Sequence, residues 1–189
     1  MSLGRCLQRL GAGIVLLFTA TQTGLDADWK IRSGESSIRV SAVSSDVTVR
    51  GGFEEFDGSI AFDPGSATGQ VRIQVKIASL VLVNPGNTKR AQQAPWFDSA
   101  TFPAAVFKAD AFKKQSTGNY TADGELTIRD VSMPLTLPFQ LSVNGGEARM
   151  TGAVELARRD FGLGLASPME DSAVAPMVRV EIELVADRL

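Results

Sequence analysis

The sequence has 189 residues with one cysteine and no histidine, and its 19 basic and 21 acidic side chains leave a formal net charge of −2. Without histidine, the chain cannot build a Ser-His-Asp triad, a Cys-His pair or a histidine zinc site. No basic run or basic-aromatic stripe of the kind that binds nucleic acid is present, so we expect no nucleic-acid partner. We also expect no metal and no cofactor.

Residues 1–27 have the pattern of a secretory signal peptide. Two arginines begin it, Gly11 to Ala20 is an apolar run that is short for a membrane span, and small polar residues follow. An amino-terminal membrane anchor is the alternative. Cleavage after Ala27 would leave one domain, residues 28–189, without Cys6. We therefore expect export to the periplasm and a mature protein without a thiol.

The first part of this domain is predicted to form β-strands, because apolar and polar residues alternate with a period of two. The strands are expected over residues 38–49, 56–62 and 71–77, with a bend after Ser44 and Ser45. Two turns are expected from composition, the first at Gly51-Gly52 and the second at Asp63-Pro64-Gly65.

The connection from Asn84 to Phe102 interrupts the alternation. Its first four residues have the composition of a turn, residues 88–94 could form about two helical turns, and Pro95 would end them. We expect the following Trp96 and Phe97 to close one end of a barrel as a plug, or to grip a ligand there.

Alternation resumes near Ala105 and continues to the end of the chain. Strands are expected over residues 105–109, 120–128, 135–141, 148–156 and 178–184, with a tight hairpin at Asn144-Gly145-Gly146 and a less regular loop over residues 158–176. Pro134 and Pro138 lack an N–H, which indicates an edge or a bulge. About eight antiparallel strands could stack as a sandwich or close as a barrel, and the pattern favours neither.

The segment 124–138, G-x-L-T-I-R-x-V-x-x-P-L-T-L-P, resembles the hallmark of the YceI-like family. Segments 52–64, 96–107, 159–162 and 178–185 agree with that family in order and spacing, so the resemblance covers nearly all of residues 28–189. The resemblance implies an all-β fold, a closed and elongated eight-stranded antiparallel lipocalin-like barrel with one short helical connection. It further implies a periplasmic protein that binds polyisoprenoid lipids, and it brings no catalytic residues.

On this reading the inward strand faces and the plug supply an apolar binding site in the barrel lumen. The candidate ligand-binding residues are Phe56, Ile60, Phe62, Val75, Ile77, Trp96, Phe97, Phe107, Leu126, Ile128, Leu137, Phe139, Met150 and Phe161. Small residues on the same faces favour a cavity, although large neighbours or bends could fill the space. They are Gly58, Ala109, Ala122, Gly124, Ala148 and Gly152.

We expect a non-enzymatic protein that transports or sequesters a long isoprenoid lipid, either a polyprenyl compound or an isoprenoid quinone. The carboxylate pairs of the sequence lie on polar strand faces, unlike a glycosidase pair. Two alternatives are a periplasmic accessory that binds quinone and docks to a membrane redox protein, and a stress-related module with a filled core. The run Arg158-Arg159-Asp160 could meet an anionic head group or form a surface ion pair.

Overall fold

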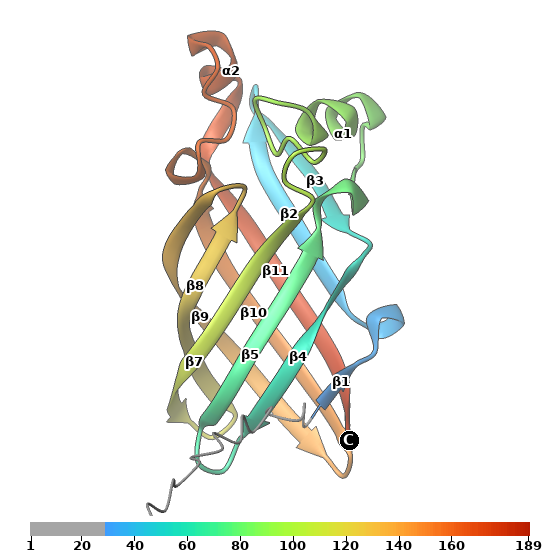
Figure 1. Cartoon of the computed structure of the whole chain (residues 1–189), viewed down its shortest axis with the longest axis vertical. Coiled ribbons are helices and arrows are strands. Elements are labelled where there is room, and N and C mark those ends of the chain that lie inside the picture. Colours follow the sequence, from blue (N-terminus) through green and yellow to red (C-terminus); the bar gives the residue numbers. More distant parts are fainter. Residues whose placement is uncertain (1–28) are drawn as a thin grey trace, which may run out of the picture.

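The period-two alternation is realised as one antiparallel sheet that closes into an elongated barrel (Figure 1). The structure, a computed structural model, describes residues 29–189; the expected signal peptide, residues 1–27, lies outside them. The strand segments are β1 (Trp29–Ile31), β2 (Ser37–Ser44), β3 (Val47–Phe53), β4 (Phe56–Asp63), β5 (Thr68–Lys76), β6 (Leu80–Leu82), β7 (Ala104–Ser116), β8 (Asn119–Ile128), β9 (Val131–Asn144), β10 (Glu147–Ala157) and β11 (Val174–Arg188).

These segments make eight barrel strands, because three strands are each interrupted once. β1 continues as β2, β3 as β4, and β5 as β6, and the paired segments keep nearly the same register on both sides of each break. Each strand pairs with its neighbour in the chain, and β11 returns to pair with β1 and β2, which closes the barrel. The expected closed eight-stranded barrel is confirmed.

The three interruptions lie side by side and form what we call the crease: Arg32–Ser36, which includes the 3-10 helix η1 (Ser33–Glu35), Glu54–Glu55, and the 3-10 helix η2 (Ile77–Ser79). At the crease, side chains replace missing ladder bonds. The amide of Glu55 donates to the Ser79 hydroxyl at 3.0 Å, and the amide of Val185 donates to the Ser36 hydroxyl at 2.9 Å. Hydrogen bonds to side chains therefore remain across the crease, although the regular backbone ladder is interrupted there.

The first hairpin turn lies at Ser45-Asp46, so the expectation of a turn at Gly51-Gly52 was wrong. Both turn residues have positive φ, 46° and 64°, as a two-residue hairpin turn of type I′ requires. Gly51 is instead a strand residue of β3, where a Cβ would lie 2.1 Å from the Val81 carbonyl oxygen of β6. The glycine permits a close approach of two strands. The turns after Asp63 and at Gly145-Gly146 lie where they were expected.

Two short helices lie at one end of the barrel, where the sequence predicted one. Helix α1 (Pro85–Gln92) begins earlier than expected, because Asn84 caps it by accepting from the Gly86 amide at 2.8 Å. Helix α2 (Pro168–Ala173) was missed, although Ser167 caps it and proline begins it. No helix within residues 29–189 is long and apolar enough to cross a membrane.

Candidate functional site

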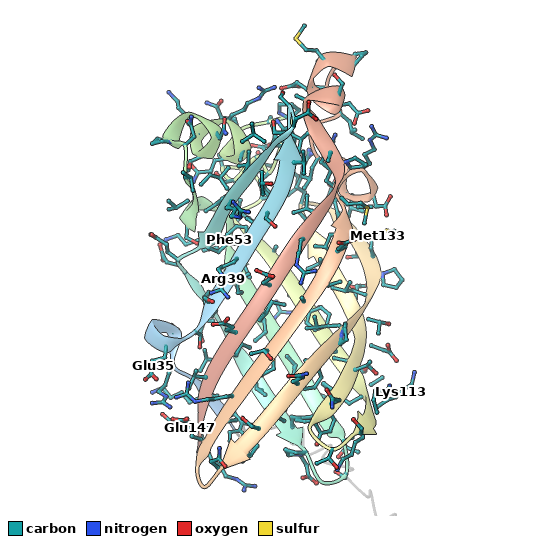
Figure 2. The ribbon with its side chains drawn as sticks, turned by 180° about the vertical axis from the view of Figure 1, so that it is seen from behind. Glu35, Arg39, Phe53, Lys113, Met133 and Glu147 are labelled. Atoms are coloured by element: carbon teal, nitrogen blue, oxygen red, sulfur yellow. The ribbon has the colours of Figure 1, made fainter. Side chains whose placement is uncertain are left out.

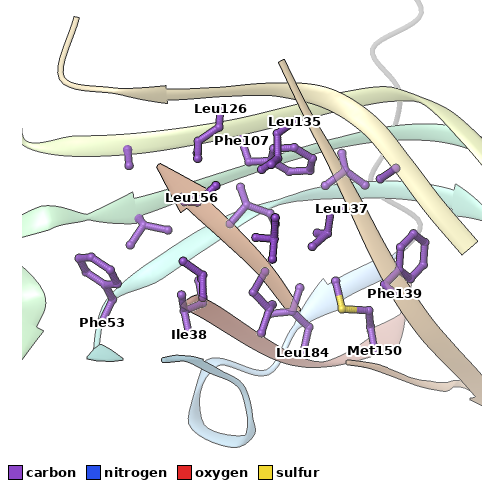
Figure 3. Close-up of a pocket in the computed structure, with 18 of the residues that line it drawn as sticks. Ile38, Phe53, Phe107, Leu126, Leu135, Leu137, Phe139, Met150, Leu156 and Leu184 are labelled. Atoms are coloured by element: carbon purple, nitrogen blue, oxygen red, sulfur yellow. The ribbon is translucent and has the colours of Figure 1, made fainter. Parts of the chain in front are cut away.

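The inward faces of the strands surround a cavity of about 240 Å³ (Figure 3). Every barrel strand contributes to its wall, as period-two alternation around a closed sheet requires. The lining residues are Trp29, Ile38, Val40, Phe53, Ile60, Phe62, Val71, Ile73, Val75, Ile77, Phe97, Ala105, Phe107, Phe112, Ala122, Leu126, Ile128, Leu135, Leu137, Phe139, Leu141, Ala148, Met150, Val154, Leu156, Arg158, Phe161, Leu163, Val178, Val180, Ile182, Leu184 and Ala186.

An aromatic layer closes the end of the lumen near the β4–β5 and β7–β8 turns; we call it the floor. Phe62 lies at its centre, with ring centroids 4.8 Å from Phe112, 5.6 Å from Tyr120 and 6.1 Å from Phe139. The Tyr120 hydroxyl donates to the Pro64 carbonyl at 3.0 Å, so the ring is held while its polar atom is satisfied. The floor is therefore packed and fixed.

Ion pairs surround the outside of this closed end. Arg32 pairs with Glu35 and Glu147, and Lys113 pairs with Asp123 across the β7–β8 hairpin. Figure 2 shows Glu35, Glu147 and Lys113 toward that end of the molecule. Exposed pairs of this kind add little stability but keep the surface polar.

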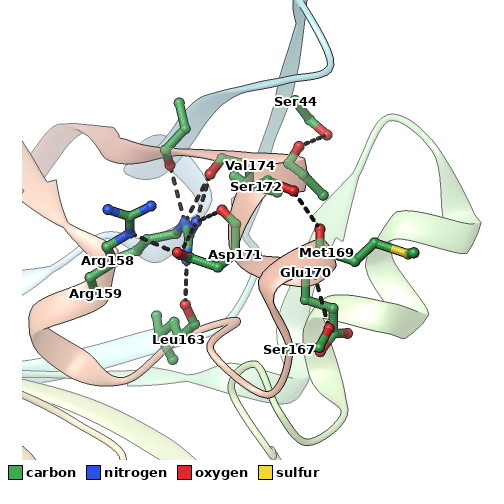
Figure 4. Close-up of polar contacts among 12 residues, drawn as sticks. Ser44, Arg158, Arg159, Leu163, Ser167, Met169, Glu170, Asp171, Ser172 and Val174 are labelled. Atoms are coloured by element: carbon green, nitrogen blue, oxygen red, sulfur yellow. Dashed lines mark hydrogen bonds and ion pairs between the residues drawn. The ribbon is translucent and has the colours of Figure 1, made fainter.

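The opposite end carries α1, the 3-10 helix η3 (Arg158–Phe161) and α2, which together we call the roof (Figure 1). Arg158 joins η3 to α2 and to the start of β11. The residue is only 2% exposed. Its side chain donates to the carbonyl oxygens of Leu163 at 2.7 Å, Val174 at 2.6 Å and Ala175 at 3.1 Å (Figure 4). It also donates to Asp171, both to the backbone and to the carboxylate.

This network leaves the lumen without a free charge. Among residues 29–189, Arg158 is the one ionisable side chain that lines the cavity, and its guanidinium is engaged by carbonyl oxygens and by Asp171. Trp96 covers the guanidinium at 5.5 Å. The expected alternatives for Arg158, an anionic head-group contact or a surface ion pair, are both replaced by a buried structural role. An apolar body is the kind of ligand that fits such a lumen.

Asp171 joins the roof helix α2 to two arginines, and acid should weaken this link. Burial raises the pKa of Asp171, but hydrogen bonds from Arg159 and Arg158 outweigh it and hold the pKa below its ordinary value of 3.8. A lowered folded-state pKa stabilises the fold above the ordinary value, and that stability is lost as pH falls through the folded-state pKa. In thermal melts at pH values from 7 to 2.5, the melting temperature should therefore fall more steeply below about pH 4 for the unmodified protein than for Asp171→Asn. Equal slopes for the two proteins would contradict this role.

All but two of the candidate ligand-binding residues lie on the cavity wall. Phe56 is buried instead in a cluster with Ile31, Ile38 and Leu184. Trp96 packs in the roof, against Arg158 and against Gly164, where an added Cβ would lie 2.6 Å from the indole ring. Neither position follows from alternation, because both depend on segments far away in the chain. The binding role of the remaining candidates stays a prediction.

Other lining residues were missed although they carried the same signal. Val178, Val180, Ile182 and Leu184 alternate on β11 as regularly as the chosen residues do. The small residues on the inward faces are small for different reasons. Ala122 and Ala148 line the cavity. At Gly124, by contrast, an added Cβ would lie 2.1 Å from the Lys108 carbonyl oxygen, so close strand contact excludes a side chain there.

Comparisons of sequence and of structure both find proteins that are similar to this chain. The family model of the YceI-like domain matches residues 29–186. A UPF0312 protein of Pseudomonas putida is 29% identical over 176 residues, which cover 86% of this chain and 84% of the relative. The crystal structure of BcnA from Burkholderia cenocepacia superposes with a TM-score of 0.78 at 26% identity, covering 82% of this chain and 98% of that one.

A polyisoprenoid binding domain from Saccharophagus degradans is similar in structure as well. It has a TM-score of 0.70 and 12% identity, and the match covers 86% of this chain and 99% of that domain. At this identity the likeness shows a shared fold.

Proposed function

This chain belongs to the YceI-like family, and on that premise we propose that it binds a long isoprenoid lipid, a polyprenyl compound or an isoprenoid quinone, in its lumen. It acts without catalysis, as a carrier or a sequestering protein, and it works in the periplasm after export directed by residues 1–27. The family membership and the polyisoprenoid binding domain of the same fold support this proposal.

The observation that carries the proposal is the lumen itself. It is apolar along its wall, and an aromatic layer closes it at one end. A stress-related module with a filled core would not leave this space, since voids in a packed core are costly. No carboxylate, serine or threonine of residues 29–189 lines the cavity, so the wall offers no general acid, general base or nucleophile to a bound molecule.

Such a site binds through burial. A chain that buries about 700 Å² of apolar surface gains roughly 15 kcal/mol gross. The ordering of a flexible ligand offsets much of this gain, so net affinity is far smaller. Affinity should therefore rise with the number of isoprene units and depend little on the head group.

Native mass spectrometry of the protein purified from the periplasm of its own organism tests the proposal. We expect a stoichiometric ligand that is released on denaturation and identified as an isoprenoid after organic extraction. Its head group separates a polyprenyl compound from a quinone. A protein that shows only the apo mass, and that stays apo after incubation with long polyprenols and quinones, would contradict lumen binding.

A further inference from the structure

The neighbouring strands β9 and β10 are hydrogen-bonded to each other along only part of their length. Strands β9 and β10 pair from Asn144 with Glu147 up to Phe139 with Gly152, and their pairing ends there. Beyond that point β9 stays paired with β8 as far as Val131, and β10 stays paired with β11 as far as Ala157. Between residues 131–138 of β9 and residues 153–157 of β10 the wall therefore has no ladder. We call this stretch the seam.

Proline explains why the ladder ends at this point. The Pro138 carbonyl oxygen would lie 3.1 Å from a Cβ added at Gly152, so the polar backbone atoms of Pro138 face β10. Proline has no N–H to return to β10, so no reciprocal pair can form. Pro134 lies four residues earlier and faces the same way, because strand sides alternate with a period of two. The two prolines remove donors that would otherwise be unpaired at an open edge.

The seam lies between an outer groove and the lumen. At its lower end lies an outer groove of about 600 Å³. Its lining comes from several strands and includes Pro138, Gly152 and Ala153, where the two strands separate. The groove and the lumen share two lining residues, Phe139 and Ile182. One layer of residues, which includes Phe139 and Ile182, therefore separates the groove from the lumen where the strands part.

Lumen residues flank the seam on both strands. Leu135 and Leu137 of β9 and Leu156 of β10 project into the same cavity, as Figure 3 shows. Above the seam the β8–β9 turn is tied to the roof, because Arg129 donates to the Gly162 carbonyl at 3.4 Å. The seam is thus an apolar stretch of wall bounded below by paired strands and above by the roof.

We propose that the isoprenoid chain passes into and out of the lumen sideways, through the seam between β9 and β10; this inference rests on the proposed function. The other two routes pass through packed or hydrogen-bonded side chains. Passage through the floor would separate the Phe62 cluster, and passage through the roof would break the Arg158 network. Passage through the seam breaks no strand pairing. A long chain can also enter segment by segment there, without being threaded end first.

A reversible bridge across the seam tests this route. Thr136 and Glu155 would be opposite each other if the β9–β10 register continued, and both are exposed on the outer face. In the full chain carrying Cys6→Ser, the pair Thr136→Cys and Glu155→Cys is joined as a disulfide or by a short bismaleimide bridge. The matched control is Ser142→Cys with Arg149→Cys, two exposed residues that already face each other in the paired part.

Loading is followed with ubiquinone-10 in phosphatidylcholine vesicles, by quenching of tryptophan fluorescence, because Trp29 lines the lumen. The bridged seam should slow quenching by about tenfold or more, with full recovery after disulfide reduction, while the control pair loads as fast as the unmodified protein. Equal loading rates for the bridged seam and the control would overturn the lateral route alone. An absence of quenching in every variant, the unmodified protein included, would overturn the proposed function and this route together.

Discussion

Replacing Arg158 with methionine should lower the free energy of unfolding by about 3–5 kcal/mol, because it removes one side of a buried charged network. Methionine has a similar length but donates no hydrogen bond. The carbonyl oxygens of Leu163, Val174 and Ala175 would lose their shared donor while they remain under the roof. Urea unfolding followed by circular dichroism measures the change.

Arg159 supplies the matched control for this prediction. It is the next residue and pairs with the same Asp171 carboxylate at 2.8 Å, but half of its side chain is exposed. Arg159→Met should therefore cost only about 0–1 kcal/mol. Similar losses for the two variants would show that Arg158 does not hold the roof. Arg158→Lys should give an intermediate loss, because it keeps the charge without the planar fork of donors.

Filling the lumen from its wall should strongly weaken ligand binding while leaving the barrel folded. Val75 lines the cavity from the middle of the wall, on β5, and lies apart from the floor, the roof and the seam. Tryptophan at this position would occupy space that the ligand needs, and we expect affinity for a long isoprenoid to fall by about 100-fold. Overpacking of the neighbouring side chains should cost about 1–3 kcal/mol of stability. Titration of tryptophan quenching by a quinone measures the affinity.

Gln74 gives the control on the same strand. It is exposed on the outer face, one residue before Val75. Gln74→Trp adds the same ring outside the barrel and should leave affinity unchanged. Equal affinities for Val75→Trp and the unmodified protein would place the ligand somewhere other than the lumen.

The sequence predicted the wall of the barrel because alternation is a local property. Each inward residue of β5 or β11 is marked by its own strand, and the hairpin at Asn144 to Gly146 is marked by its own dipeptide. The edge expected at Pro134 and Pro138 is likewise confirmed, because a missing N–H restricts pairing in any context.

The features that the sequence did not predict depend on distant neighbours. Gly51 reads as a turn residue until β6 is placed beside it, and Arg158 reads as a surface residue until the carbonyl oxygens of β11 surround it. Phe56 and Trp96 carry the same apolar signal as the lining residues, but their neighbours fill the space beside them. Period and composition contain no information about these contacts. The roles of such positions become clear only when the closed barrel is known.

The crease should give the barrel an uneven stiffness. It crosses β1/β2, β3/β4 and β5/β6, and these strands are separated from the seam by β11 on one side and by β7 and β8 on the other. The backbone ladder is therefore missing along the seam in one wall and interrupted across the crease in the opposite wall. If the seam opens, the wall opposite it must bend. A sheet bends most easily where its ladder is interrupted. The hydroxyl of Ser79, which accepts from Glu55 and donates to Lys76, stands at the line where that bending would concentrate.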